Sequence, residues 1–258
     1  MLKRSRTNTG VEWLVLDRAA ARNALSLEML EALETALTEI AAGDARCVLL
    51  AAEGPVFSSG HDLKEMRAHR ADADGGRAFY TQSMQRCARV MQAVVTLPQP
   101  VIAVVEGLAT AAGCQLAASC DLAVATPSAK FCTPGVNLGL FCSTPAVALS
   151  RAIPRKAAMD MLLTGRMVGA EEAHGMGLIN RIAEDARGAA LAIAESIAAR
   201  SALTIRMGKA GFNAQIGCAL PEAYATAAQV MIDNMMAEDA HEGISAFLDK
   251  RHPHWQDR

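Results

Sequence analysis

Two stretches rich in small residues are suited to present backbone N–H groups to a bound molecule. The first reads FSSGHDL over residues 57–63, and the second reads EGLATAAGCQL over residues 106–116. Each follows an apolar run typical of a strand and precedes a run with helical spacing, so each leaves unpaired N–H groups at a strand-to-helix turn. Two such turns can direct two donors at one oxygen, as in an oxyanion hole, and small residues let a substrate approach the backbone. Either stretch alone also fits an ordinary tight turn.

The composition is that of a globular protein with a substantial core. The chain has 258 residues, of which 52% are hydrophobic and 20% charged, and its formal net charge is −2. A near-neutral charge without a basic block argues against a nucleic-acid partner. The most apolar segment, residues 101–125, is interrupted by Glu106, Gln115 and Asp121, so it predicts a buried strand, turn and helix and no membrane span.

The cysteines favour reduced thiols. There are seven of them and no CxxC pair, so we expect a reducing compartment and a cytoplasmic protein. Cys114 and Cys120 are conceivable metal ligands, but their spacing and the lack of a second pair predict no metal site. The basic residues at the start precede no apolar run, which predicts no secretory signal.

Apolar runs alternate with segments of helical spacing. Residues 27–40 place Leu30, Leu33, Leu37 and Ile40 on one helical face, with Ser26 as the N-cap. Further helices are predicted at 79–95, 115–118, 145–152 and 155–163, and strands at 12–16, 47–52, 101–105, 121–126 and 178–182. This alternation predicts an α/β fold without fixing its topology. Residues 68–76, rich in Ala, Asp and Gly, are expected to form a mobile loop.

The segment from Ile197 onward is predicted to be helical. Pro221 is expected to open a helix that runs toward Glu238, and residues 239–251 are expected to form the last helix. A methionine stripe at Met231, Met235 and Met236 is expected to pack against the core or other subunits, because it would otherwise expose an apolar patch.

Motifs spread over nearly the whole chain are those of one superfamily. They comprise residues 18–25 (RAAARNAL), the loop FSxGxDL, residues 107–123, 129–131, 134–139 and 163–165, and EGISAFLDKR at 242–251. On these motifs the chain resembles the crotonase (enoyl-CoA hydratase/isomerase) superfamily. The sequences of residues 58–64, 111–116 and 139–145 are most similar to those of one branch, the hydratase domain-containing proteins.

This resemblance implies a fold, an assembly and a ligand. Residues 1–196 would form a right-handed spiral of ββα turns that holds an acyl-CoA site, and residues 197–258 a C-terminal helical trimerisation region. The superfamily assembles as trimers or dimers of trimers. No separate cofactor is implied, because coenzyme A is part of the substrate.

The resemblance also implies site residues. By position, the backbone N–H groups of His61 and Ala112 match the two oxyanion donors, and Lys250 would approach a CoA phosphate, across a subunit boundary in an assembly. The residues expected to contact substrate are Arg22, Ser59, His61, Asp62, Leu63, Lys64, Ala112, Asn137, Cys142, Phe247 and Lys250.

Two positions depart from the pattern of the superfamily's hydratases. Those enzymes use two glutamates to activate water and protonate the α-carbon, and the matching positions here are Gln115 and Gly135. Positioned acid/base groups contribute typically about 10²- to 10⁴-fold, so we expect weak or absent hydratase activity and a gain when both carboxylates are restored. Ser143, Cys142 with a lowered thiol pKa, and the His61 imidazole are the candidate replacements.

Two functions from different classes remain open. The first is an enzyme that acts on an acyl-CoA through an enolate-like intermediate, with an acid/base set unlike that of the hydratases. The second is a catalytically silent acyl-CoA-binding or regulatory protein. Turnover of any acyl-CoA would separate them, whereas the acyl group itself is not readable from the pattern.

Overall fold

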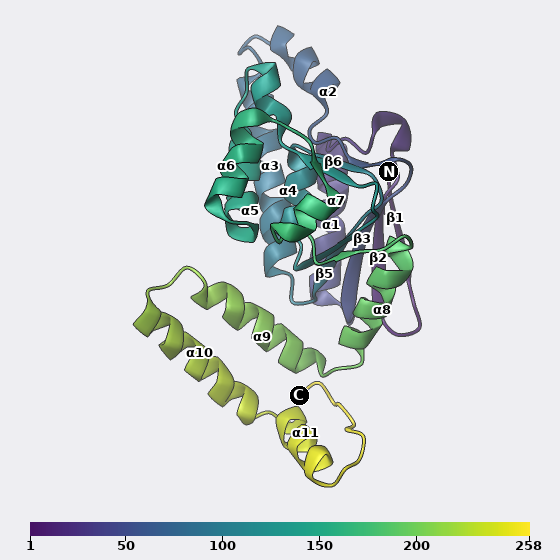
Figure 1. The fold of residues 1–258 in the computed structure, drawn as a ribbon, viewed down its shortest axis with the longest axis vertical. Coiled ribbons are helices and arrows are strands. Elements are labelled where there is room, and N and C mark those ends of the chain that lie inside the picture. The colour runs from purple at the N-terminus through teal and green to yellow at the C-terminus, as the bar shows by residue number, and fades with distance from the viewer.

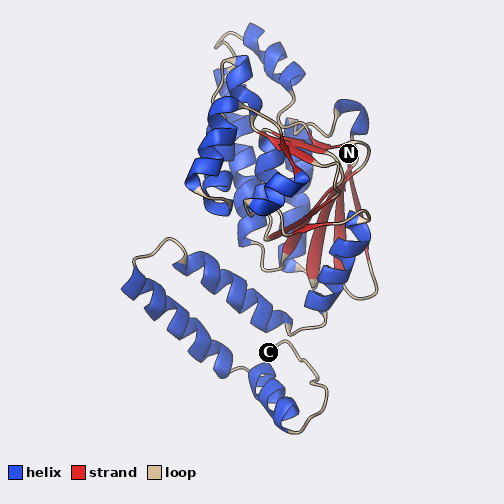
Figure 2. Ribbon diagram, viewed as in Figure 1, coloured by secondary structure: helices blue, strands red, loops and turns tan.

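The computed structural model describes residues 1–258, and its strands form two sheets beside a layer of helices (Figures 1 and 2). The strands are β1 (Leu2–Arg6), β2 (Val11–Leu16), β3 (Cys47–Ala52), β4 (Val56–Ser58), β5 (Val101–Val105), β6 (Leu108–Thr110), β7 (Leu122–Ala125), β8 (Lys130–Cys132), β9 (Val168–Gly169) and β10 (Arg181–Ile182). Six of them form one sheet in the order β1-β2-β3-β5-β7-β10, and four form another in the order β4-β6-β8-β9. Strands β2, β3, β5, β7 and β10 run parallel to their neighbours, and β1 is antiparallel to β2.

The helices connect these strands and extend beyond them. They are α1 (Leu27–Ala42), α2 (Leu63–Ala68), α3 (Arg77–Thr96), α4 (Ala112–Ser119), α5 (Ser143–Ala152), α6 (Arg155–Thr164), α7 (Ala170–Gly175), α8 (Ala186–Ala198), α9 (Ala202–Gln215), α10 (Leu220–Met235) and α11 (Glu238–Leu248). Ser26 caps α1 as predicted, since its hydroxyl accepts from the Met29 N–H at 3.3 Å.

The chain repeats one unit that the predicted spiral requires. Strand β3 joins the six-stranded sheet, β4 joins the four-stranded sheet, and helices follow; β5, β6 and α4 repeat this order, as do β7, β8 and α5. Because equivalent strands pair in parallel, the turn after β4 and the turn after β6 lie side by side. The fold therefore confirms the expected α/β class and its ββα turns.

Both faces of the six-stranded sheet are covered. Alternate residues of β3, such as Val48 and Leu50, join a cluster of 42 buried residues with α1, α3 and α4. The intervening Leu49 joins a second cluster, of 11 buried residues, in which α8 contributes Ala190 and Ala194. Burial on both sides explains why β3 reads as a continuous apolar run.

Helices α9, α10 and α11 stand apart from the sheets, and we call them the arm and the rest of the chain the body (Figure 1). Helix α9 turns by 105° from α8 at the Ala199–Ser201 hinge. No single helix is long and apolar enough to cross a membrane, and by length and composition alone only the bent pair α8–α9 meets that test. Pro221 opens α10 as predicted, but α10 has no buried residue.

One expectation stays a prediction and another needs correction. In segment 68–76 the His69 ring stacks on Phe79 with ring centres 3.8 Å apart, and Asp74 accepts hydrogen bonds from the N–H groups of Gly76 and Ala78; the mobility of this segment stays a prediction. Burial of the methionine stripe against the core is wrong for the single chain, because Met231 is 62% exposed. The arm points away from the body and leaves that stripe uncovered.

Candidate active site

The first turn lies between β4 and α2. Its backbone is held by Ser58, whose hydroxyl donates to the Asn23 carbonyl at 2.8 Å and accepts from the Gly60 N–H at 3.3 Å. Gly60 has a φ of +81°, a left-handed conformation that suits glycine, and its carbonyl accepts from the Leu25 N–H. The N–H of His61 donates to no group of the chain.

Asn23 holds this turn, a role that sequence analysis missed. It is fully buried with a φ of +50°. Its side-chain amide donates to the carbonyls of Glu53 and Val56 at 2.9 and 2.7 Å, while its oxygen accepts from the Arg18 N–H. The signal was present in the motif RNAL, because Asn tolerates a left-handed backbone better than other non-glycine residues.

The second turn lies between β6 and α4. Ala111 has a φ of 51° and a ψ of −121°, outside the regions that a residue with a Cβ normally adopts. Ala112 follows as the first residue of α4, so its N–H has no acceptor within the helix, and none is found elsewhere in the chain. The strained backbone thus directs a free donor out of the helix start.

The two turns touch through glycines. A Cβ on Gly60 would lie 3.0 Å from the Ala112 nitrogen, and a Cβ on Gly113 would lie 2.3 Å from the Ser58 carbonyl oxygen. Only glycine at these positions lets the backbones come this close. The structure therefore brings residues 60–61 and 112–113 together, and the positive end of α4 adds to the field at that point.

The His61 imidazole is buried beside the first turn. Neither ring nitrogen has a hydrogen-bond partner in the chain. Burial lowers the pKa of this imidazole below its usual value, and the nearby backbone of Leu25 opposes this shift in part. The ring is therefore neutral at physiological pH, and one nitrogen retains a lone pair.

Gln115 lies one helical turn after Ala112, on the same face of α4. Its side chain is buried, with 4% exposed, and its Oε1 has no hydrogen-bond partner. Thr133 presents a second buried and unpartnered oxygen, directly after the Cys132 carbonyl that accepts from the Ala111 N–H. An amide at position 115 can orient a ligand but exchanges no proton near neutral pH.

Gly135 has no space for a side chain. A Cβ there would lie 2.8 Å from the Cys142 sulfur and 2.8 Å from the Leu140 carbonyl oxygen. The gain in hydration expected from glutamates at 115 and 135 is therefore smaller, because the second carboxylate would displace neighbouring backbone. Sequence comparison alone could not reveal this, since it depends on how the chain folds back at Leu140.

The other candidate groups for proton transfer are less suited to it. Burial raises the pKa of the Cys142 thiol, although a hydrogen bond from the Gly135 backbone opposes the shift. The lowered pKa that a thiolate nucleophile requires is therefore not found. Ser143 is exposed, and its hydroxyl donates to the Phe141 carbonyl at 3.4 Å. Asn137 is exposed as well.

The remaining predicted contact residues separate into two groups. Asp62 caps α2 through the N–H groups of Lys64 and Glu65 and pairs with Arg18 at 3.2 Å, which favours a structural role for its carboxylate. Arg22 adjoins the first turn in space, since its carbonyl accepts from the Ser59 N–H, and the exposed Leu63 and Lys64 follow this turn in the chain.

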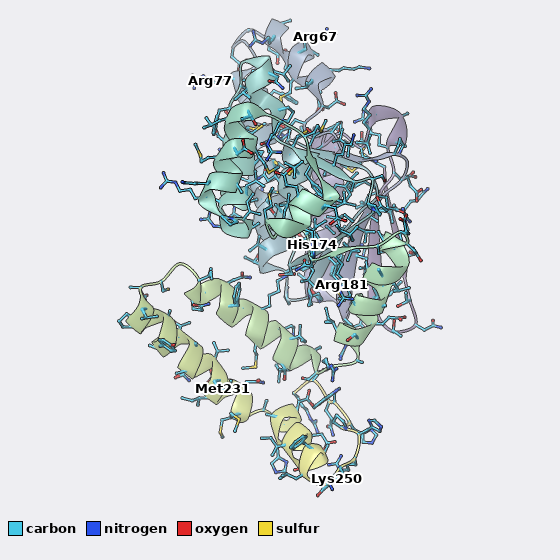
Figure 3. All side chains as sticks on the ribbon, in the orientation of Figure 1. Arg67, Arg77, His174, Arg181, Met231 and Lys250 are labelled. Carbon is cyan, nitrogen blue, oxygen red and sulfur yellow. The ribbon has the colours of Figure 1, made fainter.

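Phe247 and Lys250 lie in the other group, at the end of the arm. Figure 3 shows Lys250 far from Arg67 of α2, at the opposite end of the molecule. A single chain therefore does not bring them to the two turns. Their expected contact with coenzyme A requires a second copy of the chain.

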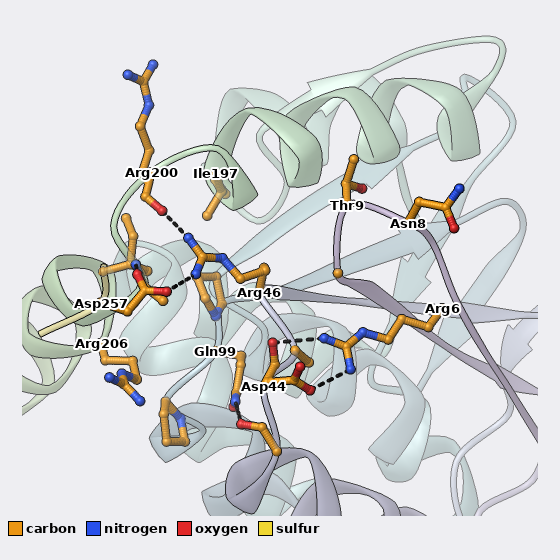
Figure 4. Close-up of a pocket in the computed structure, with 17 residues that line it drawn as sticks. Arg6, Asn8, Thr9, Asp44, Arg46, Gln99, Ile197, Arg200, Arg206 and Asp257 are labelled. Atoms are coloured by element: carbon orange, nitrogen blue, oxygen red, sulfur yellow. Dashed lines mark hydrogen bonds and ion pairs between the residues drawn. The ribbon is translucent and has the colours of Figure 1, made fainter. Parts of the chain in front are cut away.

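One polar cavity lies away from the two turns. It measures about 460 Å³, and none of the predicted site residues lines it. Its walls come from the β1–β2 turn, the α1–β3 loop, α9 and the chain end (Figure 4). No group of three or more His, Cys, Asp or Glu side chains is arranged to hold a metal ion.

Comparison with known proteins identifies the family. The family model of enoyl-CoA hydratase/isomerase matches residues 6–258. A Rattus norvegicus protein named enoyl-CoA hydratase domain-containing protein 3, mitochondrial, is 48% identical over 98% of this chain and 84% of its own length. Its Homo sapiens counterpart is 47% identical over 95% of this chain and 80% of its own length. The branch expected from the motif wording is confirmed as the one this chain resembles.

Solved structures give the same result. An enoyl-CoA hydratase from Mycobacterium smegmatis is 49% identical, with a TM-score of 0.94 over 98% of both chains. The human enoyl-CoA hydratase domain-containing protein 3 is 45% identical, with a TM-score of 0.93 over 98% of this chain and 99% of that one.

The comparison contradicts the expected cytoplasmic location. The relatives from Rattus norvegicus, Mus musculus, Homo sapiens and Danio rerio are all named as mitochondrial proteins. Unpaired cysteines indicate a reducing environment but do not distinguish one reducing compartment from another, which is why the inference failed. On the family match and these identities, the chain belongs to the enoyl-CoA hydratase/isomerase family, the crotonases.

Proposed function

We propose that this protein binds an acyl-CoA thioester with its carbonyl oxygen between the N–H groups of His61 and Ala112. The observation that carries the proposal is the free N–H of Ala112, directed out of the start of α4 by the strained Ala111 and packed against Gly60. Two donors at one oxygen stabilise the negative charge of an enolate, and removal of one donor in comparable sites costs about 3–4 kcal/mol.

The reaction class that this supports is chemistry at the α-carbon of the thioester. Charge drawn onto the oxygen acidifies the α-proton, and the neutral His61 ring has a lone pair that can accept it. Hydration of a double bond needs a further positioned acid and base. Gln115 and Gly135 supply neither, so hydratase activity is expected to be weak or absent.

A second candidate is a binding protein without turnover. The contact between Gly135 and Cys142 favours it, because it leaves no place for a carboxylate at that position. Unpartnered oxygens at Gln115 and Thr133 would then hold a polar acyl group or water instead of taking part in chemistry.

We also propose that residues 1–196 hold the acyl-CoA site and that residues 197–258 assemble the chain into a trimer or a dimer of trimers. The support is the uncovered apolar side chains of α10, among them Tyr224, Met231 and Met235. Sedimentation of the protein and of Met231→Glu/Met235→Glu tests this. The double variant should have a lower mass, and a wild-type monomer at micromolar concentration would contradict the proposal.

The function is tested by incubating the protein with acyl- and enoyl-CoA esters in D₂O and following mass. The expected result is uptake of deuterium at the α-carbon of butyryl-CoA, with hydration of crotonyl-CoA near background. Binding without exchange would favour the silent protein.

Recognition of the carbonyl is tested separately by calorimetry. Butyryl-CoA should bind more tightly than S-butyl-CoA, a thioether that retains the chain and the coenzyme but lacks the carbonyl oxygen. Equal affinities would mean that the two turns do not hold the oxygen, and failure of every CoA ester to bind would overturn the proposed function.

A further inference from the structure

The last residues of the chain return from the arm to the hinge between α8 and α9. The Trp255 indole N–H donates to the Ala199 carbonyl at 3.0 Å, and its ring packs against Gly243 of α11. Figure 4 shows Asp257 next to Arg46 of the body and the backbone of Arg200. Residues 254–258, which we call the strap, therefore meet the body, α9 and α11 at one place.

Asp257 joins the body to the start of α9. Its carboxylate pairs with the Arg46 guanidinium and also accepts from the Ala202 N–H at 2.6 Å. Arg46 in turn donates to the carbonyl of Ala198, the last residue of α8, and to that of Arg200 in the hinge. A charged pair that also caps a helix start is stronger than a neutral hydrogen bond.

Asp239 joins the strap to α11. It is 2% exposed, and its carboxylate accepts from the N–H groups of Gln256 and Asp257 at 2.7 and 2.9 Å. Its own N–H donates to the Arg258 carbonyl at 3.0 Å. Burial alone would raise the pKa of Asp239, but these N–H groups and the Ser201 hydroxyl lower it overall, so the carboxylate is ionised.

Helix α11 has few other attachments. Only Asp239 and Ala246 of this helix are buried, and Phe247 is 82% exposed. By contrast, α9 is fixed to the body by Lys209, whose ammonium pairs with Asp121 at 2.6 Å, and by Asn213, which donates to the Val95 carbonyl. Because α11 has little apolar packing, its position within one chain is set by polar contacts with the strap.

The polar cavity described above is part of the same arrangement. Its arginines Arg6 and Arg46 are already bonded to Asp44 and Asp257 and to backbone carbonyls. The cavity is thus a joint between body and arm in which these two arginines are paired within the chain, while Arg200 and Arg206, which also line it, form no ion pair.

We propose that the strap fixes α11 to the start of α9 and to the body, and so determines where the end of the arm with Lys250 is held. This inference does not depend on acyl-CoA binding. It assigns Arg46, Asp239 and Asp257 as positioning residues for the arm, far from the two turns.

Hydrogen–deuterium exchange of the full chain tests the strap. In Asp239→Asn and Asp257→Asn, amides of α11 and of the first turn of α9 should exchange at least about tenfold faster, because each change removes a charged hydrogen-bond acceptor. Amides of β3 should be unchanged. Glu222→Gln is the matched control, since it removes an exposed carboxylate of α10 that makes no contact with the strap.

A milder variant decides the case if an aspartate change unfolds the protein. Trp255→Phe keeps an aromatic ring against Gly243 but loses the N–H that donates to Ala199. It should accelerate exchange in α11 by a smaller factor, with β3 unaffected. Unchanged exchange in α11 for the strap variants that remain folded would overturn the proposal, as would an equal effect of Glu222→Gln.

Discussion

The body and the arm use similar apolar patterns with different results. In the body, the apolar faces of α1 and α3 meet β3 and β5 in one cluster of 42 buried residues. In the arm, α10 has the same mixture of apolar and polar residues and buries none of them, so Tyr224 is 71% exposed. An amphipathic pattern therefore shows that a helix face needs a packing partner, without showing whether that partner lies in the same chain or in another.

The two regions also differ in what fixes their helices. The helices of the body are fixed by apolar packing on both faces of a sheet. The contact between the two turns, also in the body, has no room for added volume. The arm is attached by polar bonds from Lys209, Asn213 and the strap. We expect changes of volume to be most damaging in the body, and changes of charge to act mainly where the arm is attached.

The largest expected difference comes from one substitution made in both regions. Gly113→Ala in the body would place a methyl 2.3 Å from the Ser58 carbonyl oxygen, whereas nothing lies within 4 Å of a methyl at Gly208 in the arm. Urea unfolding should show that Gly113→Ala costs about 3 kcal/mol or more, as overpacking against backbone does. Gly208→Ala should stabilise α9 by about 0.5–1 kcal/mol, because alanine favours a helix interior.

A result opposite to the expected one would be informative for either variant. A tolerated Gly113→Ala with unchanged CoA-ester affinity would mean that the two turns need not touch. A Gly208→Ala change that lowers stability would mean that another copy of the chain covers this face of α9.

The second prediction concerns hydratase activity. Gln115→Glu with Gly135→Glu should give little crotonyl-CoA hydration and lower stability, because the new side chain at 135 meets the Cys142 sulfur and the Leu140 carbonyl. Adding Cys142→Ala removes one of these contacts. The triple variant should hydrate crotonyl-CoA faster than the double variant. Its rate should exceed that of the wild type by at most about 10²-fold, since the new carboxylates lack surrounding groups that set their pKa and orientation.

Continuous assays of crotonyl-CoA hydration measure this series. Cys87→Ala, which removes a buried thiol of α3 remote from Gly135 in the chain, serves as the control for loss of a cysteine. Efficient hydration by the unaltered protein would refute the role given to the missing glutamates and direct mutation to His61.

Much of the body was predictable because its signals are local. Ser26 and the spacing of Leu30, Leu33 and Leu37 predict α1 correctly, and continuous apolar runs predict β3 and β5. The strands of the small sheet are three residues or fewer and were missed, since so short a run has no period. Helix α8 was missed because its buried positions are alanines.

The site was predictable only in part. The small-residue turns and the changed positions Gln115 and Gly135 are visible in the sequence. The contact that fills the space at Gly135, the hydrogen bonds of Asn23 and the strap all join residues distant in the chain. Such contacts depend on the folded path and leave no local pattern.

The third prediction tests the bond between the two regions. Lys209→Met should cost about 1–3 kcal/mol at pH 7, because it leaves the Asp121 carboxylate without its cation. Burial already raises the pKa of Asp121 while Lys209 opposes the rise. Without the lysine, the pKa of Asp121 in the folded protein should rise further above its value in the unfolded chain. The variant should therefore lose stability as pH rises through that folded pKa.

The defect of Lys209→Met should therefore be larger at pH 7 than near pH 4 in urea unfolding. Lys156→Met, at an exposed position of α6, is the control for loss of a lysine. An equal defect at both pH values would mean that lysine packing, and no charge pairing, joins α9 to the body.

The smallest expected effect is an acid transition confined to the end of the arm. Arg251 donates to both carboxylate oxygens of Glu242 at 2.6 and 2.8 Å, and this pair, with the His254 N–H, lowers the pKa of Glu242 to about 2. Because the folded pKa is below the unfolded one, the pair stabilises the arm above about pH 4.3 and loses this effect as pH falls toward 2.

The fluorescence of Trp255, adjacent to His254, measures this transition. Its intensity should change between about pH 4.3 and 2, and this change should be smaller in Glu242→Gln and in high salt. The remaining tryptophan, Trp13, belongs to β2, so the same titration in Trp13→Phe isolates the arm. A transition that persists unaltered in Glu242→Gln would assign the acid response to the carboxylates of the strap.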